Sequence, residues 1–164
     1  MGVPLSVSAQ VGNPVALLFS PDGAILWVSS GSAVFQYSLS TAYDVSTGTY
    51  ASKSLTVSNQ GITFNADGTQ FIVLVTGGQT HLKKYDLTIA YDISTATLDA
   101  SASFDFSTQD VSPTDILFYN NGQKLLMLGA SNDTVFQYST VLNTAELDLS
   151  TGSVFEITPT SDRS

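Results

Sequence analysis

The sequence contains no cysteine, and this absence removes several kinds of site. A chain without thiols has no cysteine nucleophile, no thiolate metal ligand and no disulfide framework. The N-terminus lacks a basic start followed by a long apolar run, so we expect no secretory signal peptide. No apolar stretch approaches the length of a membrane span, so we expect no membrane partner either.

Basic residues are also scarce. The chain has 5 Lys and Arg residues against 14 Asp and Glu residues, which gives a formal net charge of -9. Nucleic-acid binding depends on a clustered basic surface, and the few lysines here are mostly scattered, so we expect no nucleic-acid partner. Charged residues make up 12% of the chain and hydrophobic residues 43%. Most of the apolar segments must therefore pack against something.

Three short patterns recur in the same order, three times along the chain. The first begins with phenylalanine and ends in a turn with glycine, starting at Phe19, Phe64 and Phe118. The second is a short strand that ends in tyrosine, at Tyr37, Tyr85 and Tyr138. The third begins with aspartate followed by x-Ser-Thr, at Asp44, Asp92 and Asp148. This regular order indicates a repeat protein.

Strand and turn signals alternate within each copy and predict four short antiparallel strands. The second strands, such as 25–28 and 71–75, are apolar on both faces, as expected for a strand between two neighbouring propeller blades. We therefore predict an all-β fold of three β-propeller-like blades in a single repeat domain, 1–164. The predicted boundaries are about 7–55, 56–103 and 104–157, followed by a C-terminal tail, 158–164.

Three blades are too few to close a usual propeller, which has four to eight. We expect the exposed blade faces to be covered by oligomerisation, for example in a dimer that closes six blades, or by docking onto a larger assembly. The N-terminal segment 4–8 resembles a strand without its own blade. It is expected either to exchange into another protomer or to pack locally.

The sequence contains no convincing catalytic or metal site, so we expect a protein that is not an enzyme and needs no cofactor. His81 is the single histidine and occupies an ordinary repeat position, with no nucleophile motif around any serine. The repeated aspartates stand at turns, where a short side-chain acceptor bonds nearby backbone amides. We expect these aspartates to hold turns and not to perform chemistry.

Aromatic residues at repeated places can also bind sugars. For Tyr37, Tyr85 and Tyr138 we favour packing between blades, with each hydroxyl reaching a polar edge. Tyr43 and Tyr91 precede the Asp-x-Ser-Thr turns and are expected to be more exposed. The residues that we single out for ligand binding are Tyr43, Tyr91 and Trp27.

The run from Phe19-Ser-Pro-Asp-Gly through Val34-Phe-Gln-Tyr-Ser-Leu-Ser-Thr-Ala-Tyr-Asp-Val-Ser-Thr resembles the propeller-type repeats of bacteriophage virion proteins, and of some marine bacterial surface proteins. This resemblance implies a structural component of the virion, made in the host cytoplasm. Such a component would be a capsid decoration protein or a tail-fibre part in host attachment, with other virion proteins and its own copies as partners. The alternative is a lectin-like propeller that binds a surface glycan.

Overall fold

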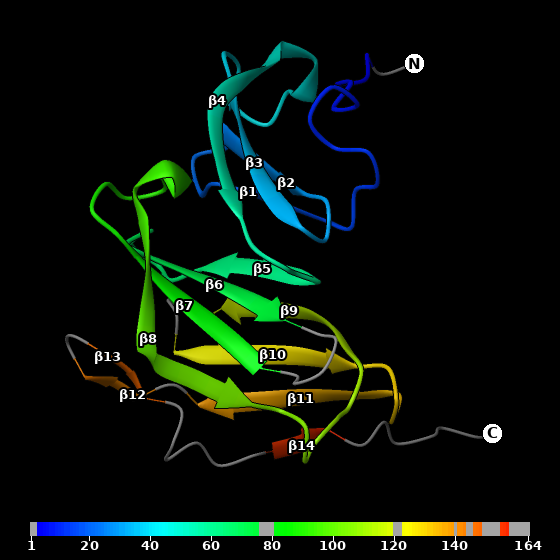
Figure 1. The fold of residues 1–164 in the computed structure, drawn as a ribbon, viewed down its shortest axis with the longest axis vertical. Coiled ribbons are helices and arrows are strands. Elements are labelled where there is room, and N and C mark those ends of the chain that lie inside the picture. The colour runs from blue at the N-terminus through cyan, green and yellow to red at the C-terminus, as the bar shows by residue number, and fades with distance from the viewer. Residues whose placement is uncertain are drawn as a thin grey trace.

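The computed structural model describes residues 3–75, 81–119, 123–139, 141–143, 146–148 and 155–157. They form three four-stranded antiparallel sheets, which we call blades 1, 2 and 3 (Figure 1). Blade 1 contains β1 (Ala16–Phe19), β2 (Ile25–Ser29), β3 (Ala33–Leu39) and β4 (Gly48–Thr56). Blade 2 contains β5 (Gly61–Phe64), β6 (Gln70–Val75), β7 (His81–Leu87) and β8 (Ala96–Asp105). Blade 3 contains β9 (Pro113–Tyr119), β10 (Lys124–Gly129), β11 (Thr134–Ser139) and β14 (Phe155–Ile157).

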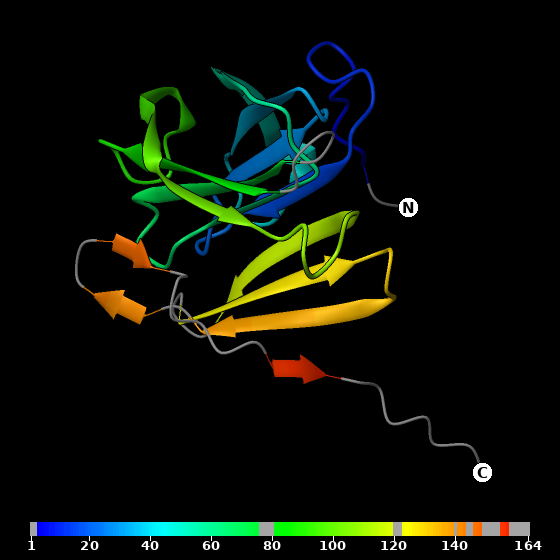
Figure 2. The ribbon, with the colours of Figure 1, turned by 60° about the horizontal axis from the view of Figure 1, so that its bottom comes forward.

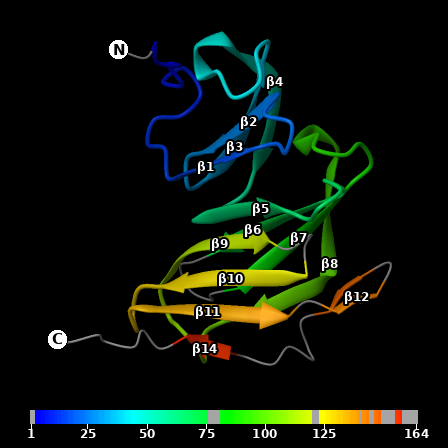
Figure 3. The same ribbon diagram turned by 180° about the vertical axis from the view of Figure 1, so that it is seen from behind.

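The prediction of an all-β fold with three propeller-like blades is confirmed. In each blade the first three strands pair in chain order, and the first strands of neighbouring blades lie beside one another. The blades follow one another from the N-terminal to the C-terminal end of the molecule (Figures 1 and 3). Within the described residues, no helix is long and apolar enough to cross a membrane.

Blades 1 and 2 are joined by a continuous apolar core. Trp27 of β2 is fully buried, and its ring lies 4.5 Å from the ring of Phe64 on β5. Phe71 and Val73 of β6 belong to the same core. The opposite face of β6 presents Ile72 to blade 3. A strand that is apolar on both faces is thus covered on both sides, as the sequence pattern predicted.

The second interface, between blades 2 and 3, follows the same rule. Ile72 and Leu74 of β6 pack in one core with Leu125 and Met127 of β10. The backbone amide of Phe118 also donates a hydrogen bond to the Thr63 hydroxyl across the interface, at 3.2 Å. We call the side of a blade that meets the following blade its forward face, and the other side its backward face.

The N-terminal residues 3–15, which we call the N-terminal cap, contain no strand and pack on the backward face of blade 1. Val11 is buried there, with Leu5 and Val7 packed against the same core, and Figure 1 shows the segment beside blade 1. Of the two outcomes expected for 4–8, the structure therefore shows local packing.

Turn chemistry follows the sequence closely in blades 1 and 2. Gly23 and Gly68 have φ of 72° and 73°, the left-handed conformation that the two Asp-Gly turns require. The Asp-x-Ser-Thr segments form the 3-10 turns η1 (Val45–Thr47) and η2 (Ile93–Thr95). Asp92 accepts hydrogen bonds from the Ser94 amide at 3.1 Å and the Ser94 hydroxyl at 2.6 Å. The predicted turn role of these aspartates is confirmed.

Blade 3 departs from the pattern after its third strand. An additional hairpin of β12 (Val141–Asn143) and β13 (Glu146–Asp148) stands between β11 and β14 (Figure 2). The third copy of the repeat is longer here, with twelve residues from Tyr138 to Ser150 against nine from Tyr37 to Ser46. The turn predicted at 121–122, most of the third Asp-x-Ser-Thr segment and the tail 158–164 lie outside the described residues.

Candidate functional site: the inner strands and the open face of blade 3

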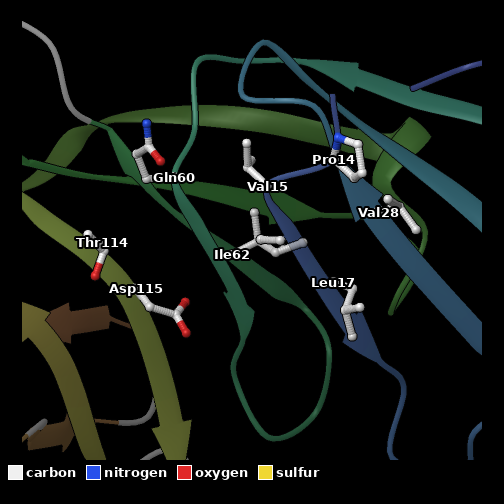
Figure 4. A pocket seen from close by; sticks show the side chains of 9 residues that line it. Pro14, Val15, Leu17, Val28, Gln60, Ile62, Thr114 and Asp115 are labelled. Atoms are coloured by element: carbon white, nitrogen blue, oxygen red, sulfur yellow. The ribbon is translucent and has the colours of Figure 1, made fainter. Parts of the chain in front are cut away.

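The first strands of the three blades border a cavity of about 530 Å³. Its walls come from β1 and the segment before it, from the start of blade 2 and from β9, as the labelled side chains show (Figure 4). Leu17 and Ile62 supply apolar surface, whereas Gln60, Thr114 and Asp115 supply polar groups. Apolar walls with a few polar groups are typical of small-molecule sites.

Among the described residues that line this cavity, Asp115 is the one that titrates. Burial raises the pKa of its carboxyl, and a hydrogen bond from the Ile116 amide at 2.9 Å opposes this rise only in part. Hydrolytic chemistry usually needs a second acid, base or nucleophile within reach, and the other lining residues offer none that titrates.

A second cavity, of about 310 Å³, lies at the turn end of the same strands. Two tyrosines line it, Tyr91 from the segment before η2 and Tyr119 from the end of β9. Phe19 and Leu117 add further apolar surface. Of the three residues predicted to bind a ligand, Tyr91 is the one that the structure places at this cavity.

Tyr43 and Tyr91 occupy equivalent positions, and both have φ of 61°, which is uncommon for residues with a side chain. The Tyr43 hydroxyl donates to the Pro21 carbonyl, and the Tyr91 hydroxyl donates to the Ala66 carbonyl at 2.9 Å. Tyr43 is 58% exposed, in line with its predicted exposure. Both hydroxyls are nevertheless engaged in holding a hairpin turn.

Trp27 has no exposed surface. Its indole N–H donates to the Gln36 side-chain oxygen at 3.2 Å, and its ring packs between blades 1 and 2. A ligand could reach this indole only by displacing that packing. The structure therefore places Trp27 neither at the surface nor beside Tyr43. The Trp27 ring does lie near Tyr91, with 6.1 Å between the two ring centres.

The repeated tyrosines are buried as predicted, but their surroundings differ. Tyr85 and Tyr138 lie in the cores between blades. Tyr37 instead lies between blade 1 and the N-terminal cap, where its hydroxyl donates to Gln10 at 3.2 Å. Burial raises the pKa of Tyr138 to about 12, and its hydroxyl has no partner among the described residues. The expected polar edge is thus absent for Tyr138, because its hydroxyl ends inside the core.

The most distinctive surface is the forward face of blade 3, on which no other blade of the described residues packs. Its centre is apolar, with Leu117 and Leu128 each 47% exposed and Val135 38% exposed. Leu126, between them, is partly buried. We call the surface made by these residues and Gln137 the open face. The sequence predicted that three blades would leave blade faces uncovered within one chain, and among the described residues no blade packs on this side of β10.

The repeat shows how unusual this exposure is. Three positions of the forward face correspond across blades 1, 2 and 3. The first holds Trp27, Ile72 and Leu126, in blade order. The second holds Ser29, Leu74 and Leu128, and the third holds Val34, Leu82 and Val135. In blades 1 and 2 all six residues are at most 3% exposed. In blade 3 all three are accessible. The open face therefore has the composition of an interface between blades and lacks its partner.

The polar part of a forward face is also repeated. Gln36 accepts one hydrogen bond from Trp27 in its own blade and one from the Ile93 amide of η2 in blade 2, both at 3.2 Å. Gln137, at the corresponding position of blade 3, accepts a hydrogen bond from the Tyr119 hydroxyl in its own blade at 2.5 Å. A second lone pair of the Gln137 amide oxygen is available to a further donor.

Sequence reasoning identified unfilled blade faces but did not identify which face is open. It also missed Gln137, although the repeated Gln at positions 36 and 137 of the sequence carried that signal. Within the described part of the chain, no three His, Asp or Glu side chains are grouped so that they could hold a metal ion. His81 begins β7 in blade 2, away from both cavity linings.

No protein-family model matches this chain, and no curated protein matches it. Its fold is similar to those of solved β-propellers. A protein from Lactobacillus plantarum matches with a TM-score of 0.58 and 19% identity, over 85% of this chain and 41% of that chain. The periplasmic gluconolactonase of Pseudomonas aeruginosa matches with a TM-score of 0.54 and 15% identity, over 88% and 39%. A Bacteroides fragilis protein, provisionally assigned as a 6-phosphogluconolactonase, gives 0.55 and 16%, over 88% and 37%.

At these identities the similarity shows the fold alone. The chain spans about two fifths of the length of these solved structures, so it corresponds to part of a propeller. The β-propeller fold predicted from the repeats is confirmed. The resemblance to bacteriophage proteins is a separate expectation, which these structures do not test.

Proposed function

We propose that this chain is a non-enzymatic assembly component that binds other protein chains through the open face of blade 3. One observation carries this proposal: Leu128 is 47% exposed, whereas its counterparts Ser29 and Leu74 are fully buried between blades. Contiguous exposed apolar patches commonly mark protein interaction sites. Covering this face would remove Leu117, Leu126, Leu128 and Val135 from water together.

We further propose that the assembly is a bacteriophage virion, in which the chain serves as a capsid decoration or tail-associated protein. The support for this finer statement is the sequence resemblance of the Phe19 to Thr47 repeat to virion repeat proteins. An acidic chain that acts through packing surfaces suits such a role. The partners would be other virion proteins and further copies of this chain.

The lactonase names belong to the solved structures and not to this chain. A non-catalytic role is supported by the use of the repeated aspartates, because Asp22, Asp67 and Asp92 all accept hydrogen bonds within their own turns. The described lining of the inner cavity offers Asp115 without a second titratable side chain.

A carbohydrate-binding role is the second candidate, and one observation favours it. The turn-end cavity brings Tyr91 and Tyr119 to one hollow, and aromatic rings beside polar groups suit the apolar faces of sugars. Glycan-array binding that is lost in Tyr119→Ala would support this role. An array without binding, together with stoichiometric recovery of the chain with purified virions, would support the structural role instead.

The assembly proposal is tested by solution mass. We expect sedimentation equilibrium to show concentration-dependent association of the wild-type chain, and Leu128→Asp to weaken this association at least tenfold. Leu98→Asp is the matched control, because Leu98 is also 47% exposed but lies on β8 of blade 2. A wild-type chain that stays monomeric at every concentration, or an equal effect of the two substitutions, would contradict the proposal.

A further inference from the structure

We infer that the open face of blade 3 receives the backward face of blade 1 from a second copy of this chain, and that the N-terminal cap competes for that backward face within each copy. This inference rests on the proposed assembly function and names its partner. It follows from how the blades already pack against one another.

Both interfaces inside the chain join a forward face to a backward face. The forward residue Trp27 meets Phe71 and Val73 on the backward side of blade 2. The forward residue Ile72 likewise meets Leu125 of blade 3. The open face is a forward face, so the surface that fits it is a backward face, as in the two interfaces inside the chain.

Within the described residues, the backward face of blade 1 is the one that no blade covers. Leu26 and Val28 occupy the positions that Phe71 and Val73 hold in blade 2 and that Leu125 and Met127 hold in blade 3. Tyr37 and Leu39 complete this face. Leu5, Val7 and Val11 of the N-terminal cap cover it in place of a blade.

The polar contacts of the two faces are complementary too. Between blades 1 and 2 the Gln36 amide oxygen accepts the Ile93 N–H at the start of η2, 3.2 Å away. Val45 holds the same position in η1 that Ile93 holds in η2. We therefore expect Gln137 of one copy to accept the Val45 N–H of the other, as a second use of the contact that Gln36 makes with Ile93.

The N-terminal cap is held mainly by side-chain packing and by few hydrogen bonds to blade 1. Its described links to the blade include the Val15 amide to the Ser29 carbonyl at 2.9 Å and the Tyr37 hydroxyl to Gln10 at 3.2 Å. Residues 3–15 add no strand to the sheet. Such a segment can be displaced at lower cost than a paired strand, since no ladder of hydrogen bonds must break.

Two copies joined in this way have two identical contacts related by a two-fold axis. Each copy supplies three blades, so the closed dimer has six, which lies within the usual range for propellers. A two-fold contact between two open faces would instead place Gln137 against its own equivalent and would leave both blade 1 faces capped.

Chemical cross-linking distinguishes these arrangements, because the chain has no native cysteine. Gln137→Cys places a thiol on the open face, and Ser46→Cys places one in η1, next to Val45. After the two single variants are mixed, we expect a short bismaleimide to link Gln137→Cys with Ser46→Cys. Ser94→Cys is the matched control, because its turn already receives Gln36 inside the same chain.

Deletion of residues 2–11 tests the role of the cap. Because the cap competes with the second copy, we expect this deletion to strengthen dimerisation at least tenfold in sedimentation equilibrium. Strand exchange through the same segment predicts the opposite change, a lower assembly mass. Val11→Ala, which removes one buried contact of the cap, provides a milder variant whose fold is checked by circular dichroism.

The outcomes separate this inference from the assembly function. Cross-linking of Gln137→Cys only with itself, or dimerisation that the deletion does not strengthen, would overturn the inference while leaving assembly through the open face intact. If no cross-link forms and Leu128→Asp behaves like Leu98→Asp, then both the inference and the assembly function are wrong.

Discussion

The Tyr43 ring lies so close to Gly23 that a methyl group on Gly23 would stand 2.4 Å from the Tyr43 Cδ2 atom. Tyr91 and Gly68 repeat this contact in blade 2, again at 2.4 Å. In both pairs the tyrosine amide donates to the glycine carbonyl, at 2.9 and 2.8 Å. Each tyrosine therefore secures the first hairpin of its blade to the segment before the 3-10 turn.

Gly23→Ala is expected to destabilise blade 1 strongly. The left-handed backbone at φ 72° disfavours alanine, and the new methyl group must displace the Tyr43 ring. We expect a loss of roughly 2 to 4 kcal/mol in the free energy of unfolding. Gly12→Ala, at a glycine with nothing within 4 Å of an added methyl group, is the control and should change little. Urea denaturation of both variants measures the difference.

Replacing both Tyr43 and Tyr91 with alanine separates a ligand role from a structural one. The exposure that the sequence predicted for both tyrosines would leave thermal stability nearly unaltered by this change. The structure predicts a clear loss, because two ring contacts and two hydroxyl hydrogen bonds disappear. Each Tyr→Phe single variant should lose about 1 kcal/mol. Calorimetric melting that matches the wild type for the double variant would contradict the structural role.

Two buried tyrosines, Tyr37 and Tyr138, test how much a hydrogen bond to a buried hydroxyl contributes to stability. Tyr138→Phe removes a buried hydroxyl that has no described partner, so we expect unchanged stability or a gain of up to about 1 kcal/mol. Tyr37→Phe removes a hydroxyl that donates to Gln10, so we expect a loss of about 1 kcal/mol. Denaturant midpoints of the two variants should therefore shift in opposite directions or differ clearly. Equal losses would show that Tyr138 has a partner.

Lys84 is a buried cation with two carboxylate partners, and we expect Asp99 to stabilise it more than Asp86 does. Its ammonium lies 2.8 Å from Asp99 and 3.5 Å from Asp86. Lys84→Met keeps the volume and removes the buried charge, so we expect a change within about 1 kcal/mol. Asp99→Ala leaves the cation with its weaker partner and should cost more than Lys84→Met. Chemical denaturation gives the ranking, and a reversed order would contradict this account.

Acid should weaken the fold through its turn carboxyls. The Ser20 hydroxyl and the Ala24 amide lower the pKa of Asp22, and the Thr69 hydroxyl and amide lower that of Asp67. Burial raises the pKa of Asp92, but Lys53 and Ser94 together bring it below its ordinary value.

A carboxyl with a lowered folded-state pKa binds its proton more readily in the unfolded chain. Its stabilisation is therefore present above the unfolded pKa of about 4 and is lost as the pH falls further. We expect the urea midpoint to decrease steadily from pH 4 to pH 2. Asp92→Asn should show a shallower decrease than the wild type. A urea midpoint that rises as the pH falls from 4 to 2 would contradict the lowered pKa values of these carboxyls, since it would require folded-state pKa values above those of the unfolded chain.

Much of the fold could be predicted from the sequence, because turns and strand patterns that span only a few residues define the propeller repeat. The Asp-Gly turn requires a left-handed backbone conformation at Gly23, and the Asp92 side chain accepts the amide of Ser94, two residues further on. Both features depend on only a few neighbouring residues. The four-strand period and the buried face of β6 follow from the same local patterns. Assembly and origin in a virion were predicted as well, and these stay predictions.

The sequence by itself thus determined the number of blades and the turns of blades 1 and 2, and it led to the expectation that two blade faces would lack a neighbouring blade. Only the tertiary structure decided that the N-terminal cap fills the backward face of blade 1, that Leu128 of blade 3 is left open and that Trp27 is inaccessible. The physical reason is that burial depends on what lies opposite a residue. Positions that look alike in the repeat, such as Leu74 and Leu128, differ only in whether a neighbouring blade is present.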